Sequence, residues 1–222
     1  EVFPPRGPRR YWSRRSLAEW LAERLREGPP TLVGIDHAFS FPRRYFDRYG
    51  LGPSWPDFLD DFQWHWPTDE EQTYVDFVRE GMCGKGAERE GNARWRRLTE
   101  TRCGAKSVFH FDVPGQVAKS THAGLPWLRF LRAKTGAFTH FWPFDGWRVP
   151  DGTSAVVEVY PRLWSSAIAR DGRSSDQHDA YSAAEALRRA DADGCLQELL
   201  APKLTEGERD TARIEGWILG VA

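Results

Sequence analysis

The sequence predicts an α/β fold, and three observations support this. Two short apolar runs, at 31–36 and 154–161, have the length and the Val and Ile content of buried strands. Segments in which apolar residues recur at helical spacing lie before, between and after these runs. The chain has 222 residues, of which 40% are hydrophobic, so it is long enough to bury a sizeable core around such a sheet.

The segment 16–27 is expected to be the first helix, because its apolar residues recur at helical spacing. These residues are Leu17, Trp20, Leu21 and Leu25. Ser13 or Ser16 is a suitable N-cap, and Gly28, followed by two prolines, ends the helix. The first strand comes next and ends on Asp36, at the point where an α/β sheet commonly binds its ligand.

The segment 43–106 differs from its surroundings in the distribution of its charges. It is predicted to be an insertion of helices and loops within a single domain, 1–222. Its part 57–76 contains seven acidic residues and no Lys or Arg, whereas 85–106 contains seven Lys or Arg and three Glu. No internal repeat or low-complexity linker divides the chain.

The next elements again show strand and helix patterns. Residues 107–113 (SVFHFDV) alternate like a strand, and 138–146 are aromatic and strand-like up to a proline. The segment 120–136 between them is expected to be a helix with Ser120 or Thr121 as its N-cap.

Two capping boxes predict the last helices. Ser174 and Gln177 have the spacing of such a box at the start of an alanine-rich helix at 174–190. Thr205 and Glu208 repeat the pattern ahead of a closing helix. The small alanine side chains allow the first of these helices to approach a sheet closely.

Composition and charge argue against several classes of protein. The formal net charge is −1, so the overall charge indicates neither a nucleic-acid nor a membrane partner. The sequence contains no run of 18 apolar residues and no signal peptide. Its three cysteines lack the spacing of a zinc site or a disulfide framework and are typical of reduced thiols. These features predict a cytoplasmic protein that binds no membrane, and they leave its oligomeric state open.

Three acidic residues stand at the ends of predicted elements. Asp36 ends the first strand, Glu158 interrupts the apolar run of the later strand, and Asp179 lies near the start of the alanine-rich helix. A buried acid is costly unless it is paired or binds a metal. Carboxylates that converge from strand ends and a helix suit Mg²⁺ or Mn²⁺. Two such ions about 4 Å apart can activate water and stabilise the leaving oxygen in phosphodiester cleavage.

Asp36, Glu158 and Asp179 are therefore predicted to be catalytic metal ligands. Asp176, one turn earlier on the helix, is a further candidate ligand, and His178 is a candidate proton donor or acceptor.

Each of these residues also has an ordinary structural interpretation. Asp36 could cap the next turn. Asp179 could be a helix acid favoured by the helix dipole, and Glu158 could be a strand residue paired with an arginine. His178 could be an exposed residue of the first helical turn.

The basic and aromatic run RWRR, at 94–97, is a candidate surface for a nucleic acid. Cations next to an aromatic ring can bind phosphates and stack a base. Downstream, a lysine and a serine that follow Gly104 could hold a phosphate. The predicted substrate contacts are Arg94, Trp95, Arg97, Lys106 and Ser107. The alternative is a solvated helix face that balances the acidic block.

Several common catalytic motifs are absent from the sequence. It has no HExxH, no GxSxG and no GxxxxGK[ST], which argues against a zinc protease, an α/β-hydrolase and a P-loop NTPase.

Six stretches, taken in order, resemble the DUF429 family, predicted nucleases of the ribonuclease H-like (RNase H-like) superfamily. They are GIDHAFSFP, GAKSVFHFD, THAGLPWLRFLR, FWPFDGW, VVEVYPRLW and QHDAYSAAEAL. The likeness runs from about residue 11 to the C-terminus, and its most specific parts are the first strand with its Asp, the EVYP stretch and the acid-bearing helix.

The resemblance implies an RNase H-like mixed central sheet flanked by helices, and a hydrolase that cleaves phosphodiesters with Mg²⁺ or Mn²⁺. Asp36, Glu158 and Asp179 would supply carboxylates at matching positions. The family's usual opening, a β-hairpin with a first Asp, has no counterpart before residue 31, and residues 2–3 would be the tail of the third strand. The chain is therefore expected to lack the first N-terminal strands and one catalytic Asp.

The leading hypothesis is thus a metal-dependent nuclease, or a fragment of one, with nucleic acid as its partner. The alternative is a non-catalytic RNase H-like module that binds a partner or a nucleic acid through a tryptophan-rich surface. That surface would consist of Trp55, Trp64, Trp66 and Trp95. Convergence of the three acids would favour the first hypothesis.

Overall fold

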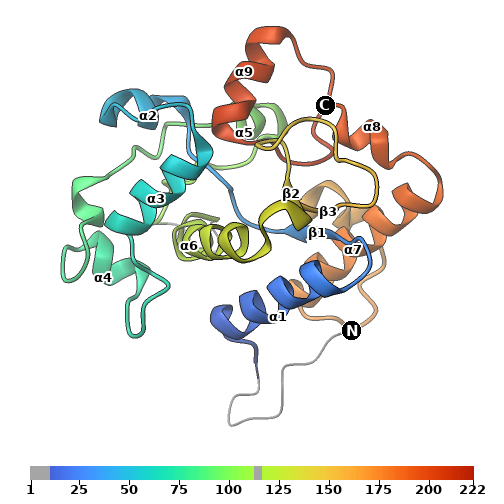
Figure 1. Ribbon diagram of the computed structural model, residues 1–222, viewed down its shortest axis with the longest axis horizontal. Helices are drawn as coiled ribbons and strands as arrows, with labels where there is room; N and C mark the ends of the chain where they lie inside the picture. Colours follow the sequence, from blue (N-terminus) through green and yellow to red (C-terminus); the bar gives the residue numbers. More distant parts are fainter. Residues whose placement is uncertain (1–10, 113–116) are drawn as a thin grey trace.

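The computed structural model describes residues 11–112 and 117–222 and has a mixed α/β fold. Within this part of the chain, a parallel three-stranded sheet has the strand order β1-β3-β2 (Figure 1). The strands are β1 (Leu32–Ile35), β2 (Thr139–Phe141) and β3 (Ser154–Glu158). The predicted α/β class and the two apolar strands are confirmed, and β2 lies within the aromatic segment 138–146. Residues 2–3, the expected tail of a strand, lie outside the described residues.

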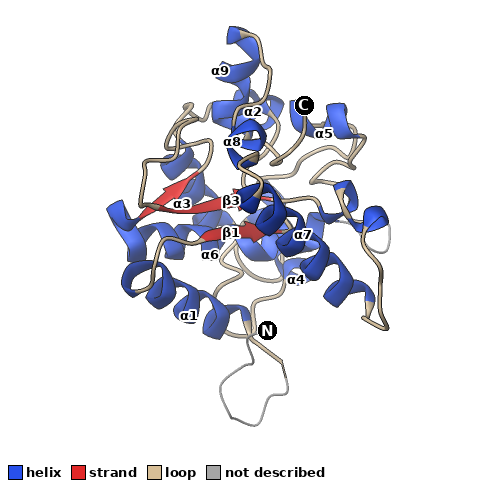
Figure 2. Ribbon diagram, turned by 90° about the vertical axis from the view of Figure 1, so that its right-hand side faces the viewer, coloured by secondary structure: helices blue, strands red, loops and turns tan. Residues whose placement is uncertain are grey.

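The middle strand, β3, is buried along its whole length. Alternate side chains of a strand face opposite sides of a sheet. Val156 belongs to the core that includes α1 and α6, whereas Val157 belongs to the core that includes α7. These helices are α1 (Arg14–Glu27), α6 (Val117–Thr135) and α7 (Ser175–Ala192). In Figure 2, α1 and α6 lie below the strands. Burial on both faces explains why the sequence of β3 is continuously apolar.

Side-chain caps fix the starts of several helices. Ser13 Oγ accepts a hydrogen bond from Ser16 N at 3.0 Å, so α1 begins two residues earlier than the predicted segment. The two predicted capping boxes, at 174–177 and 205–208, are confirmed and begin α7 and α9 (Glu206–Glu215).

The predicted N-caps of α6 are wrong. The helix begins at Val117, and the Ser120 hydroxyl, inside it, donates a hydrogen bond to the Val117 carbonyl. The Thr121 hydroxyl accepts a hydrogen bond from Ala38 N at 3.1 Å. Thr121 therefore connects α6 to the chain that follows β1. It does not cap the N-terminus of the helix.

The strand predicted at 107–113 is wrong as far as residue 112, where the description of this segment ends. His110 N donates a hydrogen bond to the Ser107 carbonyl at 3.0 Å, which closes a turn. The two apolar residues between them are buried in the core. The apolar residues of this segment are thus buried in a turn. Over so few residues, a buried turn and a short strand give the same alternating pattern.

The segment 43–106 contains helices and loops, as predicted, and no strand. Its helices are α2 (Arg43–Tyr49), α3 (Trp55–His65), α4 (Val75–Arg79) and α5 (Leu98–Cys103). Phe41, which follows β1, packs edge-on against Phe58 and Phe62 of α3 at centroid distances of 5.3 and 5.5 Å. The segment thus shares the core that lies between the sheet and α6.

The chain ends with α8 (Leu196–Leu200), α9 and a short extended stretch. Leu219 N in this stretch donates a hydrogen bond to the Glu158 carbonyl at 2.9 Å, so the C-terminus lies next to the end of β3. Among the helices described, none combines the length and the apolar character needed to cross a membrane.

Candidate functional site

A cavity of about 520 Å³ opens at the carboxyl ends of β1 and β3. It is a polar cavity, and its walls come from six separate segments of the chain. The lining residues that bear on chemistry are Asp36, His37, Lys106, Glu158, Arg162 and Asp179. Asp36, Glu158 and Asp179, the three acids predicted from the sequence, therefore share one cavity.

The strand register brings two of these acids together. Ile35 pairs with Glu158 across the parallel ladder, so Asp36 leaves β1 at the level where β3 ends. α/β sheets bind ligands at the end of the sheet where the carboxyl ends of neighbouring parallel strands lie side by side. Asp36 and Glu158 therefore reach the same end of the sheet from adjacent strands.

Close packing of α7 on the sheet brings the third acid. A Cβ atom at Gly34 would lie 2.7 Å from Val159 Cγ1 and 3.6 Å from Leu187 Cδ1, so glycine makes room here. Leu187 belongs to α7, and Asp179 lies two turns before it on the same helix. The glycine therefore makes room for Val159, and α7 packs on β1 through Leu187 with Asp179 lining the cavity.

The acids change the protonation of Asp36. The Asp36 residue is exposed at the mouth of the cavity, but its carboxyl is partly shielded from water by the cavity walls. Partial burial, followed by repulsion from Asp179 and Glu158, raises the pKa of Asp36 from 3.8 to about 6. Neither Asp36 nor Asp179 has an ion pair or a side-chain hydrogen bond within the part of the chain that is described.

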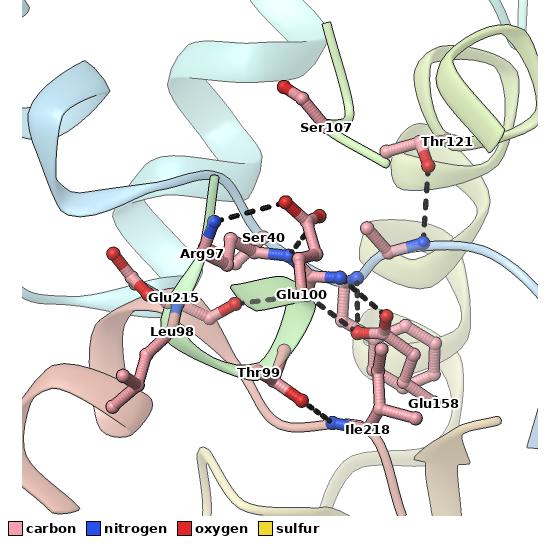
Figure 3. A network of polar contacts seen from close by, with 12 residues as sticks. Ser40, Arg97, Leu98, Thr99, Glu100, Ser107, Thr121, Glu158, Glu215 and Ile218 are labelled. Atoms are coloured by element: carbon pink, nitrogen blue, oxygen red, sulfur yellow. Dashed lines mark hydrogen bonds and ion pairs between the residues drawn. The ribbon is translucent and has the colours of Figure 1, made fainter. Parts of the chain in front are cut away.

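Glu158, in contrast, is fully engaged. Its two oxygens accept hydrogen bonds from Arg97 Nη1 at 2.7 Å and from Arg97 Nη2 at 2.6 Å (Figure 3). Phe39 N donates a third, longer bond at 3.3 Å. Glu158 is 4% exposed and Arg97 1%, so this is a buried bidentate ion pair. The structural interpretation of Glu158, a strand acid paired with an arginine, is therefore the one observed.

Arg97 is the centre of a larger buried network. Its Nε donates to Glu100 Oε1 at 2.8 Å, and its Nη1 also donates to the Glu215 carbonyl at 3.1 Å. Burial alone would lower the pKa of Arg97, but Glu158 and Glu100 outweigh it and raise the pKa. Burial raises the pKa of Glu100, against the opposing effect of Arg97.

Glu215, at the end of α9, caps two other helices. Its Oε1 accepts a hydrogen bond from Arg43 N at 2.7 Å, and its Oε2 accepts one from Leu98 N at 2.6 Å. Arg43 and Leu98 are the first residues of α2 and α5. One carboxylate thus satisfies a terminal N–H of both helices and fixes the 43–106 segment to the C-terminal part of the chain.

The other residues predicted around the metal lie apart from the cavity. Asp176 is exposed on α7 and does not line the cavity. His178 also does not line it, and its Nε2 lies 3.1 Å from the carbonyl of Ser165. The structural interpretation of His178, an exposed residue of the first helical turn, does not describe this half-buried position, because the ring is bonded to a different segment.

The predicted basic and aromatic run is divided between surface and core. Arg94 is exposed but lies outside the cavity, and the half-buried ring of Trp95 packs edge-on against Phe109 at a centroid distance of 6.1 Å. Ser107 is buried and donates its hydroxyl hydrogen bond to the Trp95 carbonyl. Lys106 is exposed and lines the cavity. Of the predicted substrate contacts, Lys106 is therefore the one with an accessible charge at the cavity.

The tryptophan-rich surface of the alternative hypothesis is largely internal. Trp55 and Trp66 are 3% and 2% exposed, and Trp95 is half-buried. Trp64, 66% exposed, is the one member of the four with a freely accessible ring. Most of these rings therefore belong to the core of the helical segment.

The sequence analysis missed several residues of this region. Arg162 lines the cavity from a turn of 3₁₀ helix, Pro161–Leu163, just after β3. Its position next to the strand that ends on Glu158 was the available signal. Glu100 and Glu215 gave no such signal, because helical acids are usually exposed.

His37 forms part of the wall between the cavity and α6. Burial lowers the pKa of its imidazole, so the ring is neutral at neutral pH. A Cβ atom at Gly124 of α6 would lie 2.3 Å from His37 Nε2, so the ring packs directly on the helix backbone. Gly124 is therefore required for the position of His37.

Replacing Gly124 with alanine is expected to destabilise the protein by about 1–3 kcal/mol, because the ring of His37 must move. Without a clash, alanine in a helix interior stabilises a protein by about 1 kcal/mol relative to glycine. A loss of stability in Gly124→Ala would therefore indicate the clash with His37. Urea unfolding measures the change. The matched control is Gly207→Ala in α9, where nothing lies within 4 Å of the new Cβ and no loss is expected. A Gly124→Ala protein as stable as the wild type would contradict this packing.

The fit of a divalent cation is partial. Among the described residues, no group of three or more His, Cys, Asp or Glu side chains is arranged to hold a metal ion. The Arg97 pairing of Glu158 accounts for this, since it removes one of the three predicted ligands. Asp36 and Asp179 remain as two carboxylates that repel each other and have no cationic partner, and oxygen ligands of this kind suit Mg²⁺ or Mn²⁺.

Comparison of the chain with models of protein families, with curated proteins and with solved structures finds no match. The functional argument therefore depends on the geometry of the cavity.

Proposed function

We propose that the cavity at the ends of β1 and β3 hydrolyses phosphodiester bonds in nucleic acid with a bound Mg²⁺ or Mn²⁺. The fold we propose for this activity is RNase H-like, as in the DUF429 nucleases that the sequence resembles. The observation that carries the proposal is the convergence of Asp36 and Asp179 beside Glu158, which raises the pKa of Asp36 to about 6. Two carboxylates without cationic partners repel each other at the carboxyl ends of the strands. A bound divalent cation would remove this repulsion.

Each residue has a defined part in this proposal. Asp36 and Asp179 would hold the cation, and Glu158 would keep the geometry of the cavity through its ion pair with Arg97. The cation, when bound, would polarise the phosphate and lower the pKa of water. Lys106, at the cavity, would neutralise part of the charge of the phosphate.

One observation favours the alternative, a non-catalytic binding module. The closed ion pair between Arg97 and Glu158 leaves two acids where the resemblance implies three, and a site with two carboxylates binds a cation less tightly. The two functions differ in whether a divalent cation binds at all.

Calorimetric titration with Mn²⁺ tests the proposal. Binding is expected in the wild type, and a loss of at least about tenfold in affinity is expected in Asp36→Asn and in Asp179→Asn, because each variant removes a charged ligand. Asp176→Asn is the matched control, since Asp176 is an exposed acid on the same helix outside the cavity. If the wild type binds neither Mn²⁺ nor Mg²⁺, the metal mechanism is ruled out. The non-catalytic binding module is then the better-supported function.

A further inference from the structure

We propose that Lys106 and Arg162 form a phosphate-binding rim that directs a single-stranded nucleic acid into this cavity. This inference rests on the proposed function, and it names the form of the substrate. Both residues line the same cavity as the acids. Neither has an ion pair or a side-chain hydrogen bond to any residue in the described ranges, so both cations are available.

The two cations come from rigidly placed segments. Lys106 follows α5 after Gly104, whose φ of 69° lies in the left-handed region and turns the chain sharply. Arg162 lies in the 3₁₀ turn Pro161–Leu163, directly after the residues that continue β3. Both segments are attached to the Arg97 network, since α5 and β3 provide Glu100 and Glu158. The rim is therefore built on the same framework as the acids.

The arrangement of charge separates two tasks. The acids Asp36 and Asp179 attract a cation, whereas an unpaired lysine and arginine attract the phosphates of a polyanion. A strand with one phosphate beside the acids can place neighbouring phosphates against Lys106 and Arg162. The guanidinium of Arg162 can bind two phosphate oxygens at once, and the ammonium of Lys106 acts as a point charge.

The dimensions of the cavity favour a single strand. A volume of about 520 Å³ is that of a small-molecule site and accommodates a few groups of an extended chain. Duplex DNA instead is bound along a broad surface with many phosphate contacts. Tyr160, which is half-buried, also lines the cavity and offers an aromatic ring to a base.

The test is the binding of oligothymidylate of about 12 nucleotides, a length that covers one single-strand site. Fluorescence anisotropy is measured in Ca²⁺, which occupies oxygen sites, across a series of salt concentrations. Lys106→Gln and Arg162→Gln are each expected to weaken binding about tenfold. Each is also expected to reduce the slope of log K against log salt by about 0.7.

The matched controls are Lys203→Gln and Arg148→Gln. Both residues are exposed cations outside the cavity, without an ion pair among the described residues. Neither control is expected to change the affinity or the salt slope. Binding that is as tight in the cavity variants as in these controls would overturn the inference, and so would a wild type that binds duplex more tightly than the single strand.

The outcome is separable from that of the proposed function. If Mn²⁺ binds to the acids but the oligonucleotide does not depend on Lys106 or Arg162, the rim is disproved and the metal site stands. If the oligonucleotide depends on both cations while no divalent ion binds, the rim is supported and the hydrolytic function is disproved.

Discussion

Replacing Arg97 with methionine is expected to destabilise the protein by about 3–5 kcal/mol, the cost of breaking a buried ion pair by removing one partner. Methionine has a similar length but removes the guanidinium, so Glu158 keeps the bond from Phe39 N, Glu100 keeps the bond from the backbone N of residue 97, and both lose their cation. It also leaves the Glu215 carbonyl without the bond from Arg97 Nη1. Urea unfolding, followed by tryptophan fluorescence, measures the loss.

Arg96→Met is the matched control. Arg96 is the neighbouring residue, is exposed, and has no ion pair among the described residues, so its replacement is expected to change the unfolding free energy by less than about 0.5 kcal/mol. The double variant Arg97→Met with Glu158→Gln should recover part of the loss, because it removes one stranded charge. If Arg97→Met were as stable as Arg96→Met, the buried network would contribute nothing.

The network also explains why the 43–106 segment belongs to the site. Arg97, just before α5, binds Glu158 at the end of β3, and Glu100 of α5 holds the guanidinium of Arg97. Glu215 caps α2 and α5 from α9. The helical segment 43–106 is thereby fixed to the sheet and to the C-terminal helix through charged groups. The energetic cost of burying those charges is offset by their mutual hydrogen bonds.

Local signals in the sequence predict much of the fold. The apolar runs that became β1 and β3, and the capping boxes at 174–177 and 205–208, depend on neighbouring residues alone. The convergence of Asp36, Glu158 and Asp179 in one cavity also follows from their places at strand and helix ends. These features need no knowledge of the tertiary structure.

Features that depend on one specific pairing of residues far apart in the sequence were not predictable. Arg97 and Glu158 are 61 positions apart, so no sequence pattern shows that the arginine of the RWRR run is a buried partner of the strand acid. The turn at 107–112 has the apolar alternation of a strand, and its burial by α3 and α6 is a tertiary effect. Both cases show tertiary packing overriding a local pattern.

Asp36→Asn is expected to lower phosphodiester hydrolysis by at least about tenfold, because the variant removes a charged ligand of the cation that would polarise the phosphate. For the wild type at subsaturating Mg²⁺, the rate should rise with pH up to about 6, because a proton on Asp36 competes with the cation. Hydrolysis of the oligonucleotide, compared with Asp176→Asn as the control, measures this. A variant that retains wild-type activity would exclude Asp36 from the reaction.

The same substitution is expected to increase stability at neutral pH. The folded-state pKa of Asp36, about 6, lies above its ordinary value of 3.8, so the folded protein binds this proton more tightly than the unfolded chain does. The contribution of Asp36 to stability is therefore fully present below pH 3.8 and is lost as the pH rises to about 6. Above that pH the ionised carboxylate opposes folding, and an asparagine does not.

Between pH 4 and pH 6, the unfolding free energy of Asp36→Asn should thus increase relative to that of the wild type. Above pH 6 the difference should stay constant. Because Asp36 is exposed at the cavity mouth, salt should reduce this difference. Added Mg²⁺ should stabilise the wild type and leave the variant little changed, since a cation that binds the folded state raises its stability. A variant that is less stable than the wild type at pH 7 without metal would show that Asp36 supports the fold, and that its ionised carboxylate is not repelled by Asp179 and Glu158.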